Sequence, residues 1–181
     1  MIHYLKGDAT KPQRNPAMIL SIVNDVGLYG AGFTASLDKR WPIVGDEYRR
    51  LMNSKSPPAL GDIASVKVRN GIVVINMWAQ HGVGRNKQRV DYVALEQCLE
   101  NVARYIRKTY LGYSIHIPRI GCGLGGGDWD VVETLIDTAF YDICDVFVYT
   151  FKKKIKKYKP HIYKRNPVKY PAKEEITKKG E

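Results

Sequence analysis

The chain has 181 residues, which is enough for one domain with a sizeable hydrophobic core. It contains no apolar stretch near the roughly 20 residues that a membrane-spanning helix needs, and no signal peptide at its start. We therefore expect a cytoplasmic protein without a membrane partner. Three cysteines, Cys98, Cys122 and Cys144, are too few and too scattered for a disulfide framework or a zinc site, so no metal site or cofactor is expected.

The net charge of +11 is distributed unevenly along the chain. Residues 152–181 contain 12 of the 29 Lys and Arg residues but only three of the 18 acidic residues, so this segment accounts for +9. Tyr158, Tyr163 and Tyr170 lie among its lysines. Such a segment can contact nucleic acid weakly through phosphates and unpaired bases, or it can be a solubilising, partly disordered extension. We expect a nearly neutral domain over residues 1–151, followed by a basic C-terminal extension over residues 152–181.

Strands and helices are expected to alternate from the start of the chain. Residues 1–5 and 18–23 predict strands, and the second is a continuous apolar run typical of a strand buried on both faces. A helix is expected over Phe33–Arg40, ended by Pro42 because its ring disfavours helical geometry at the preceding residue. A short helix is expected around residues 46–52.

The second half of the chain continues this alternation. Residues 63–69 and 72–77 predict two strands joined at Asn70-Gly71, a dipeptide typical of hairpin turns. The remaining expected elements are a polar loop over residues 80–89, a helix over 91–110, a strand over 114–117, a helix over 130–143 and a strand over 146–151. Together they predict an α/β fold, a three-layer α/β/α sandwich with a central mixed sheet.

Two glycine-rich loops, residues 27–32 and 121–127, each follow a buried strand. Glycine lets the backbone approach a charged group closely, and free N–H groups at the start of the next helix can face an anion. The second loop is not followed, at the right distance on a next strand, by the acidic residue of a dinucleotide-binding fold, and it lacks the Gly-Lys-Ser/Thr of a Walker loop. Ligands of open α/β sheets bind at the carboxyl ends of strands, so the two loops predict a site for an extended ligand with at least two phosphates. A purely structural glycine turn is the alternative.

Two further residues fit such a ligand. Asp8, just past the first strand, can accept a hydrogen bond from an exocyclic amine such as that of adenine. Phe151, at the end of the last strand, can stack on a base. The alternatives are that Asp8 caps a helix and that Phe151 belongs to the core.

Three segments, residues 7–10, 24–33 and 118–124, together resemble the macro domain family in consistent order. The chain is most similar to the subgroup that contains terminal ADP-ribose protein glycohydrolase and the yeast-type ADP-ribose 1″-phosphate phosphatase, over about residues 1–151. The resemblance implies a macro-domain sandwich that binds ADP-ribose or an ADP-ribose derivative. The expected ligand-binding residues are Asp8, Ala9, Asn24, Gly30, Ala31, Gly32, Phe33, Ile120, Gly121, Cys122, Gly123, Leu124 and Phe151.

The resemblance also implies a role for each group of these residues. Asp8 would meet the adenine amine, and Asn24 would approach the distal ribose. Residues 30–33 and 120–124 would hold the diphosphate and the distal ribose.

The catalytic residues of these relatives transfer poorly to this chain. Relatives of the glycohydrolase type carry an aspartate where this chain has Gly125, and a lysine just after the fourth strand, where this chain has Met-Trp-Ala-Gln at residues 77–80. Relatives of the phosphatase type carry a histidine where this chain has Ser21. A Schiff-base mechanism is not expected, because it needs an amine within bonding distance of the sugar carbon.

Asp128 and His81 remain as candidate catalytic residues. The carboxylate of Asp128 could orient water toward a terminal phosphate while His81 donates a proton to the leaving oxygen, without a metal ion. The alternatives are a helix N-cap for Asp128 and a solvated loop position for His81. The sequence therefore predicts an ADP-ribose 1″-phosphate phosphatase. The competing hypotheses are a hydrolase that acts on O-acetyl-ADP-ribose or on ADP-ribosylated protein or nucleic acid, and a noncatalytic ADP-ribose reader.

Overall fold

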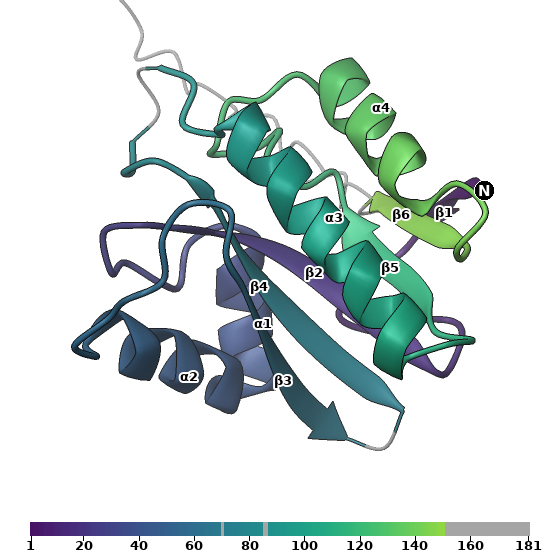
Figure 1. The fold of residues 1–181 in the computed structure, drawn as a ribbon, viewed down its shortest axis with the longest axis horizontal. Coiled ribbons are helices and arrows are strands. Elements are labelled where there is room, and N and C mark those ends of the chain that lie inside the picture. Colours follow the sequence, from purple (N-terminus) through teal and green to yellow (C-terminus); the bar gives the residue numbers. More distant parts are fainter. Residues whose placement is uncertain (70, 85–86, 151–181) are drawn as a thin grey trace, which may run out of the picture.

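A computed structural model describes residues 1–69, 71–84 and 87–150 of the chain. Among the described residues, six strands form one sheet in the order β1-β6-β5-β2-β4-β3 (Figure 1). Five of them run parallel, and β3, at one edge, runs antiparallel to β4. The strands are β1 (Ile2–Lys6), β2 (Ala17–Asn24), β3 (Ile63–Arg69), β4 (Ile72–Gln80), β5 (Ser114–Pro118) and β6 (Val146–Thr150). The central sheet is therefore mixed, as predicted.

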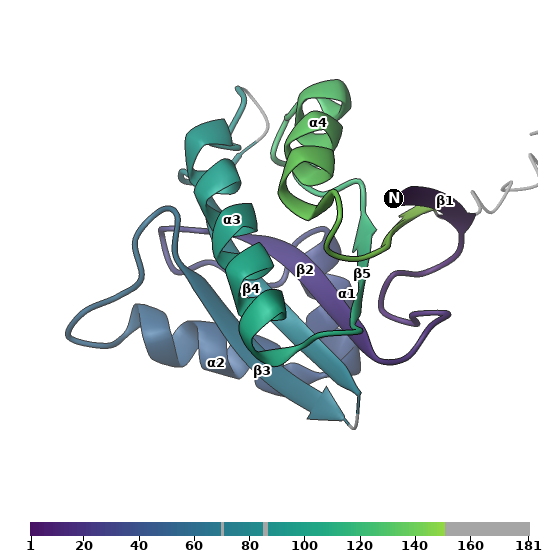
Figure 2. The same cartoon turned by 45° about the vertical axis from the view of Figure 1, so that its right-hand side comes forward.

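Helices cover both faces of the sheet. The helices are α1 (Phe33–Arg40), α2 (Pro42–Met52), α3 (Tyr92–Thr109) and α4 (Trp129–Phe140). Because side chains of a strand alternate between faces, Met18 and Leu20 of β2 join the core beneath α3 and α4, while Ile19 joins the core beneath α1 and α2. Figure 1 and Figure 2 show the two helix pairs on opposite sides of the sheet. The three-layer α/β/α sandwich is confirmed.

The helix α1 has the predicted bounds, but α2 begins at Pro42, earlier than the expected start near residue 46. Proline fits the first position of a helix, where its missing N–H would have no intrahelical partner and its fixed φ suits the helix. Pro42 therefore begins α2 as well as following α1. Trp41 separates the two helices, and its N–H donates to the carbonyl of Leu37 at 2.7 Å.

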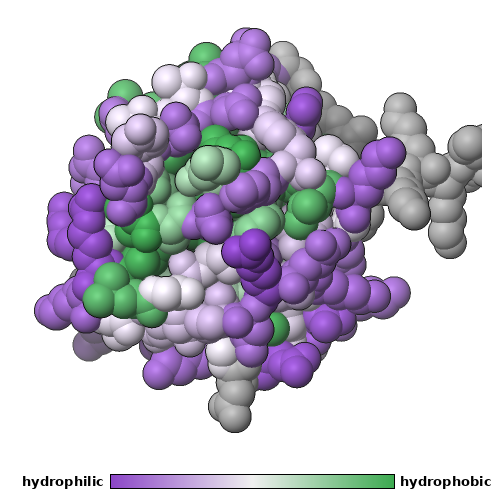
Figure 3. All heavy atoms as spheres, turned by 90° about the vertical axis from the view of Figure 1, so that its right-hand side faces the viewer, coloured by the Kyte–Doolittle hydropathy of each residue, from purple (hydrophilic) through white to green (hydrophobic). Residues whose placement is uncertain are grey.

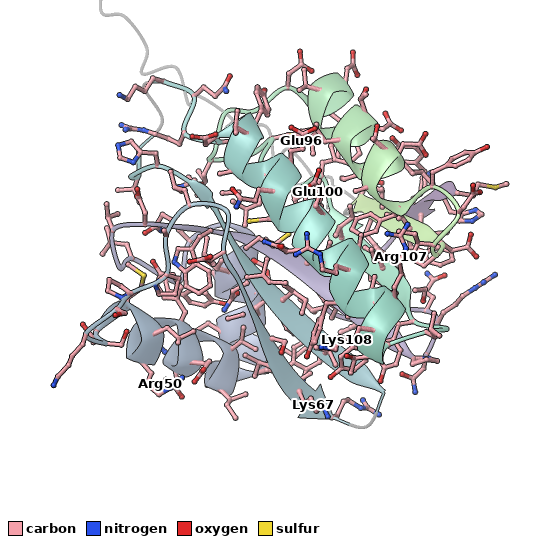
Figure 4. All side chains as sticks on the ribbon, in the orientation of Figure 1. Arg50, Lys67, Glu96, Glu100, Arg107 and Lys108 are labelled. Atoms are coloured by element: carbon pink, nitrogen blue, oxygen red, sulfur yellow. The ribbon has the colours of Figure 1, made fainter. Side chains whose placement is uncertain are left out.

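The helix α3 shows the expected division into an apolar and a charged face. Leu95, Leu99 and Val102 are buried against the sheet, whereas charged side chains such as Glu96 and Arg107 lie on its outer side (Figure 4). Figure 3 looks onto the side that carries β1, where hydrophilic residues surround a smaller apolar area. Within the described residues, every helix is too short or too polar to cross a membrane.

The parallel strands β1, β6, β5, β2 and β4 have their carboxyl ends at the same edge of the sheet. The connections that leave this edge include both glycine-rich loops, so the fold brings them to one side of the molecule. Phe151 and the basic extension over residues 152–181 lie outside the described residues. The expected base stacking, the nucleic-acid contact and the domain boundary at residue 151 therefore stay predictions.

A buried histidine, His116, links the neighbouring strands β5 and β6 through hydrogen bonds. His116 of β5 is fully buried, and its ring nitrogens bond the Ser114 hydroxyl at 2.9 Å and the Tyr149 hydroxyl at 2.8 Å. The Tyr149 hydroxyl also accepts a hydrogen bond from the N–H of Gln13, at 3.0 Å. Burial, assisted by the charge of Arg14, lowers the pKa of His116 to about 4. The folded protein therefore holds this ring neutral.

Stability is expected to fall in mild acid because of His116. The unfolded chain takes up a proton near the ordinary histidine pKa of 6.5, while the folded pKa is about 4, so stability is lost as the pH falls from about 6.5 toward 4. We expect a loss of ~2 kcal/mol between pH 7.5 and pH 5.0, measured by urea unfolding. His116→Gln should be less stable at pH 7.5 but should lose less stability on acidification. An equal pH dependence in both proteins would refute this assignment.

The pH window separates the titration of His116 from that of the Asp145 carboxyl group. The hydrogen bond from His3 lowers the pKa of Asp145 below its usual value of 3.8, despite partial burial. Stability from a carboxylate with a lowered pKa is lost only below its unfolded pKa. Asp145 therefore does not contribute to the change between pH 7.5 and pH 5.0.

Candidate functional site

Two adjoining cavities lie at the carboxyl edge of the sheet. The first cavity, of about 250 Å³, lies between the start of α1 and the β5–α4 loop (residues 119–128). The second cavity, of about 350 Å³, lies between the β2–α1 loop (residues 25–32) and the residues that follow β4. Their shared lining residues are Ile22, Ala31, Thr34, Gln80 and Leu124. The two cavities therefore form one elongated cleft, and both glycine-rich loops line it.

Gly32 marks the place where the two loops meet. A Cβ atom on Gly32 would lie 3.4 Å from the side chain of Leu124, and the residue has a φ of +60°, which favours glycine. Gly32 also precedes α1 without any side-chain cap. The first N–H groups of a helix have no intrahelical partner, and the lining of the first cavity includes Phe33 and Thr34 of this first turn. The start of α1 is therefore suited to bind an anion.

Thr34 fixes the conformation of the β2–α1 loop. Its hydroxyl accepts hydrogen bonds from the N–H groups of Gly30 and Ala31, both at 3.1 Å, and donates to the carbonyl of Ala31 at 2.8 Å. These two N–H groups are therefore occupied within the protein. The donors that this loop can offer to a ligand come from the start of α1.

Backbone hydrogen bonds hold the β5–α4 loop in place. The carbonyl of Gly125 accepts from the N–H groups of Arg89 at 2.8 Å and Val90 at 3.2 Å. The N–H of Gly127 donates to the carbonyl of Gly121 at 2.9 Å. Gly123 lines the first cavity, and a Cβ atom there would meet nothing within 4 Å. The loop thus presents bare backbone to open space at Gly123.

Gly125 stands where relatives of the glycohydrolase type carry an aspartate, and the space around it is too small for a side chain. A Cβ atom on Gly125 would lie 2.7 Å from the carbonyl oxygen of Gly121 and 2.7 Å from the side chain of Val90. Such contacts are too short for any side chain in this loop conformation. The aspartate that those relatives carry therefore cannot be accommodated here without moving the loop.

Asn24 lines the second cavity but is bonded to its own loop. Its side-chain oxygen accepts from the N–H groups of Val26 at 3.1 Å and Leu28 at 3.2 Å. The buried hydroxyl of Tyr48 donates to the backbone carbonyl of Asn24 at 2.9 Å. Tyr48 stacks on Trp78, with ring centroids 5.7 Å apart, and burial raises its pKa to about 12. Asn24 therefore shapes the wall of the cavity, and its hydrogen-bonding groups are already engaged.

His81 is hydrogen-bonded to Asp25, a pairing that the sequence did not predict. Nδ1 of His81 lies 2.6 Å from one carboxylate oxygen of Asp25, and the other oxygen accepts from the N–H of Gly82 at 2.8 Å. Burial alone would raise the pKa of Asp25, but the bonds from Gly82 and His81 outweigh it and lower that pKa. Asp25 and His81 directly follow Asn24 and Gln80, which both line the second cavity. A carboxylate-oriented imidazole therefore lies next to the cleft at its rim, where the His81 side chain is 72% exposed and outside the cavity lining.

Asp128 caps the helix α4. Its Oδ1 atom accepts a hydrogen bond from the N–H of Asp130 at 3.0 Å, and its own N–H donates to the hydroxyl of Tyr92 at 2.8 Å. The residue is exposed and is not part of the cavity lining. The structure thus shows the capping role and pairs His81 with Asp25 instead of Asp128. A catalytic role of Asp128 stays a prediction.

Most of the expected ligand-binding residues surround the cleft. The cavity lining includes Asn24, Ala31, Gly32, Phe33, Ile120, Gly121, Gly123 and Leu124. The remaining four described residues, Asp8, Ala9, Gly30 and Cys122, lie outside this lining. Burial raises the pKa of the Cys122 thiol to about 11, so the residue is a thiol at neutral pH.

Asp8 and Ala9 lie at the same edge, after β1. The Oδ1 atom of Asp8 accepts from the N–H and the hydroxyl of Thr10, at 2.9 and 2.8 Å. Ala9 is buried beside Phe147 and Tyr149, with Phe33 packed against the same cluster. Phe33 thus connects the β1 end of this edge with the first cavity.

The sequence reasoning missed Thr34, Gln80 and the pairing of Asp25 with His81. The sequence predicts a loop at Gln80, but this residue ends β4 and lines both cavities, and its Nε2 atom donates to the carbonyl of Gly82 at 2.9 Å. The nearly continuous apolar run of β4, which goes on through Trp78 and Ala79, could have indicated that this strand extends past Met77. Within the described residues there is no group of three or more potential metal ligands.

Comparison with known proteins identifies the family. No family model matches the chain. An uncharacterised 17.5 kDa protein of Enterobacteria phage T4, from the tk-vs intergenic region, is 24% identical over 141 residues, covering 76% of this chain and 89% of the phage protein. The solved structure of Thermosipho africanus DarTG in complex with ADP-ribose has a TM-score of 0.61 at 17% identity, over 75% of this chain and 38% of that one.

Two solved structures are more similar. A protein of unknown function from Bacteroides thetaiotaomicron is 35% identical, with a TM-score of 0.77, and the match covers 83% of this chain and 98% of that one. A macrodomain protein from Streptomyces coelicolor is also 35% identical, with a TM-score of 0.72, over 83% of this chain and 99% of that one. With this identity across nearly the whole relative, the chain belongs to the macrodomain family.

Proposed function

We propose that this protein binds ADP-ribose derivatives in the cleft and hydrolyses ADP-ribose 1″-phosphate to ADP-ribose and phosphate. The observation that carries the proposal is the Asp25–His81 pair at the rim of a cleft that both glycine-rich loops line. Membership of the macrodomain family supports ADP-ribose as the ligand, as does the complex of the DarTG relative with ADP-ribose.

The shape of the cleft suits an elongated ligand with a charged centre. In the proposed complex, the diphosphate lies between the uncapped start of α1 and Gly123, where backbone N–H groups and helix dipole favour an anion. The adenosine lies beyond the diphosphate on the side of Phe33, toward Asp8 as the resemblance implies, and the distal ribose occupies the second cavity beside Gln80. This orientation brings the 1″ position toward the rim with His81.

The proposed chemistry is general acid catalysis of ester hydrolysis. Water attacks the phosphorus, the P–O bond to the ribose breaks, and His81 donates a proton to the departing ribose oxygen. The proton released by the water restores His81, so the products are ADP-ribose and inorganic phosphate. Asp25, whose pKa is lowered by the bonds from Gly82 and His81, fixes the ring through Nδ1. Asp128 is the further candidate for orienting the water.

A second candidate function is removal of ADP-ribose from a modified macromolecule. The mouth of the second cavity carries Leu28 and Val83, which are 59% and 41% exposed, and Val26 lies exposed in the same loop. Exposed apolar side chains at a site can pack against a leaving group larger than phosphate. A panel of ADP-ribose 1″-phosphate, O-acetyl-ADP-ribose, and ADP-ribosylated protein and DNA separates the candidates. Release of phosphate from the first compound alone supports the phosphatase.

Gly123→Val should abolish tight binding of ADP-ribose without unfolding the protein. The new side chain enters open space in the free protein but occupies the first cavity, where the diphosphate would approach the backbone. We expect at least a tenfold increase in the Kd for ADP-ribose, measured by titration calorimetry, with an unchanged melting temperature. Ala59→Val, an enlargement at an exposed position that lines neither cavity, serves as the control. Wild-type affinity in Gly123→Val would exclude this site.

Substitutions of the candidate catalytic side chains should lower phosphate release while ADP-ribose still binds. His81→Gln removes the proton donor, so we expect kcat on ADP-ribose 1″-phosphate to fall at least 100-fold. Asp25→Asn should lower kcat less, since it misorients the ring without removing it. Full activity in His81→Gln would contradict the assigned mechanism.

Two variants of Asp128 distinguish its role as the N-cap of α4 from a catalytic role of its carboxylate. Asparagine is as good an N-cap as aspartate, so Asp128→Asn preserves the start of α4 while Asp128→Ala removes the cap, at a cost of about 1 kcal/mol. If the carboxylate orients water, both variants lose phosphatase activity. If Asp128 only caps the helix, Asp128→Asn keeps wild-type kcat, and the candidate role is withdrawn.

A further inference from the structure

Gln80 places its side-chain amide at the junction of the two cavities. It is the last residue of β4, it is only partly buried, and it lines both cavities. Its Nε2 atom donates to the carbonyl of Gly82 at 2.9 Å. Its Oε1 atom faces the β5–α4 loop, 3.4 Å from the position that a Cβ atom of Gly125 would take. Gly125 lines the first cavity and Val83, which follows Gly82, lines the second, so the amide spans the junction.

The Oε1 atom of Gln80 is an acceptor that a ligand in the cleft can reach. A carbonyl only accepts hydrogen bonds, so the amide nitrogen must be the atom that faces Gly82, and this fixes the orientation of the amide. Oε1 makes no hydrogen bond with any of the described residues. Unlike the buried hydroxyl of Ser21, which also has no partner there, Oε1 keeps solvent-accessible surface. Gln80 therefore presents an accessible acceptor in a fixed orientation.

Only a hydrogen-bond donor can satisfy this acceptor, which narrows the part of the ligand that meets it. The diphosphate of ADP-ribose and the 1″-phosphate of the proposed substrate carry acceptor oxygens and negative charge, so Oε1 repels them. The distal ribose carries hydroxyl groups, which can donate. In the proposed complex this ribose occupies the second cavity beside Gln80. Its hydroxyls are therefore the donors that this part of the ligand brings to Oε1.

We propose that the Gln80 side chain is a specificity-determining contact that accepts a hydrogen bond from the 2″ or 3″ hydroxyl of the distal ribose. The contact rests on the proposed binding of ADP-ribose in the cleft, but not on the proposed hydrolysis. It narrows the substrate class to ligands with a free hydroxyl at this position, because an acyl group there replaces the donor with acceptors. It also turns the phosphates away from Oε1, toward the N–H groups at the start of α1.

Gly82 connects Gln80 with the Asp25–His81 pair. The carbonyl of Gly82 accepts from Gln80, and its N–H donates to Asp25 at 2.8 Å. A substitution of Gln80 can therefore act in two ways, by removing the acceptor Oε1 or by releasing Gly82. The experiment has to separate these two effects, and ligands that lack single groups of the distal ribose do so.

The test compares Gln80→Met with a matched control, Gln88→Met. Methionine keeps the length of the side chain but forms neither of the amide hydrogen bonds. Gln88 also donates from Nε2 to a backbone carbonyl two residues further on, that of Val90 at 3.0 Å, but it is exposed and lines neither cavity. Titration calorimetry on the full chain measures the affinities for ADP-ribose, for its 2″-deoxy and 3″-deoxy analogues, and for ADP, which lacks the distal ribose.

Gln80→Met should bind ADP-ribose about three- to tenfold more weakly, because one neutral hydrogen bond is lost, and should bind ADP like the wild type. The wild type should bind one of the two deoxy analogues more weakly than ADP-ribose by a similar factor. Gln80→Met should bind that analogue and ADP-ribose equally, since each change removes the same contact. Gln88→Met should keep every affinity of the wild type.

Three outcomes would overturn the proposed contact while ADP-ribose binding stands. The first is wild-type affinity for ADP-ribose in Gln80→Met. The second is an equal loss for ADP and ADP-ribose, which would assign Gln80 to the shape of the cleft. The third is a Gln80→Met protein that discriminates against the deoxy analogue as strongly as the wild type, because the hydroxyl then meets another group. Failure of the wild type to bind ADP-ribose would overturn the proposed function as well.

Discussion

The start of α1, which lines the cleft and has no side-chain cap among the described residues, is the feature on which the site depends. The parallel strands bring their carboxyl ends to one edge, and two of the connections there are rich in glycine. The helix α1 begins at Gly32 without a side-chain cap, and Gly123 presents bare backbone to open space. An anionic ligand can supply acceptors for the N–H groups of this first helical turn. The hydroxyl of Thr34 accepts from the N–H groups of Gly30 and Ala31, and the side chain of Asn24 accepts from those of Val26 and Leu28, so the β2–α1 loop is held by its own side chains.

Much of the fold could be predicted because local signals and tertiary structure agree. The apolar run of β2, the Gly71 turn between β3 and β4 and the helix before Trp41 each follow from short stretches of sequence. The start of α2 could not be placed, because Pro42 can either follow a helix or begin one, and packing of Val44 and Tyr48 on the sheet decides between these. Nor does local sequence determine the strand order, which depends on long-range pairing.

The sequence predicted those parts of the candidate site that the backbone forms, which are the two glycine-rich loops, but not the pairing of side chains around them. The glycine-rich loops follow strands, so the sequence indicated their place at the sheet edge. The pairing of His81 with Asp25 joins residues 56 positions apart, and it exists because β2 and β4 are neighbours in the sheet. Asp128 could be a cap or a catalytic group by sequence, and the structure shows the cap. Gly125 shows why one missing aspartate cannot simply be restored, since Val90 occupies the space beside it.

The aromatic stack behind the second cavity has a consequence for the kinetics of ligand binding. Tyr48 packs between Tyr29 and Trp78, and its hydroxyl donates to the carbonyl of Asn24. The side-chain oxygen of Asn24 accepts from the N–H of Val26 and so fixes the loop that follows β2. A wall that is already rigid gives up little conformational entropy when a molecule enters. Association then requires no ordering of this wall, so the affinities of different ligands for this cleft will differ mainly through their dissociation rates.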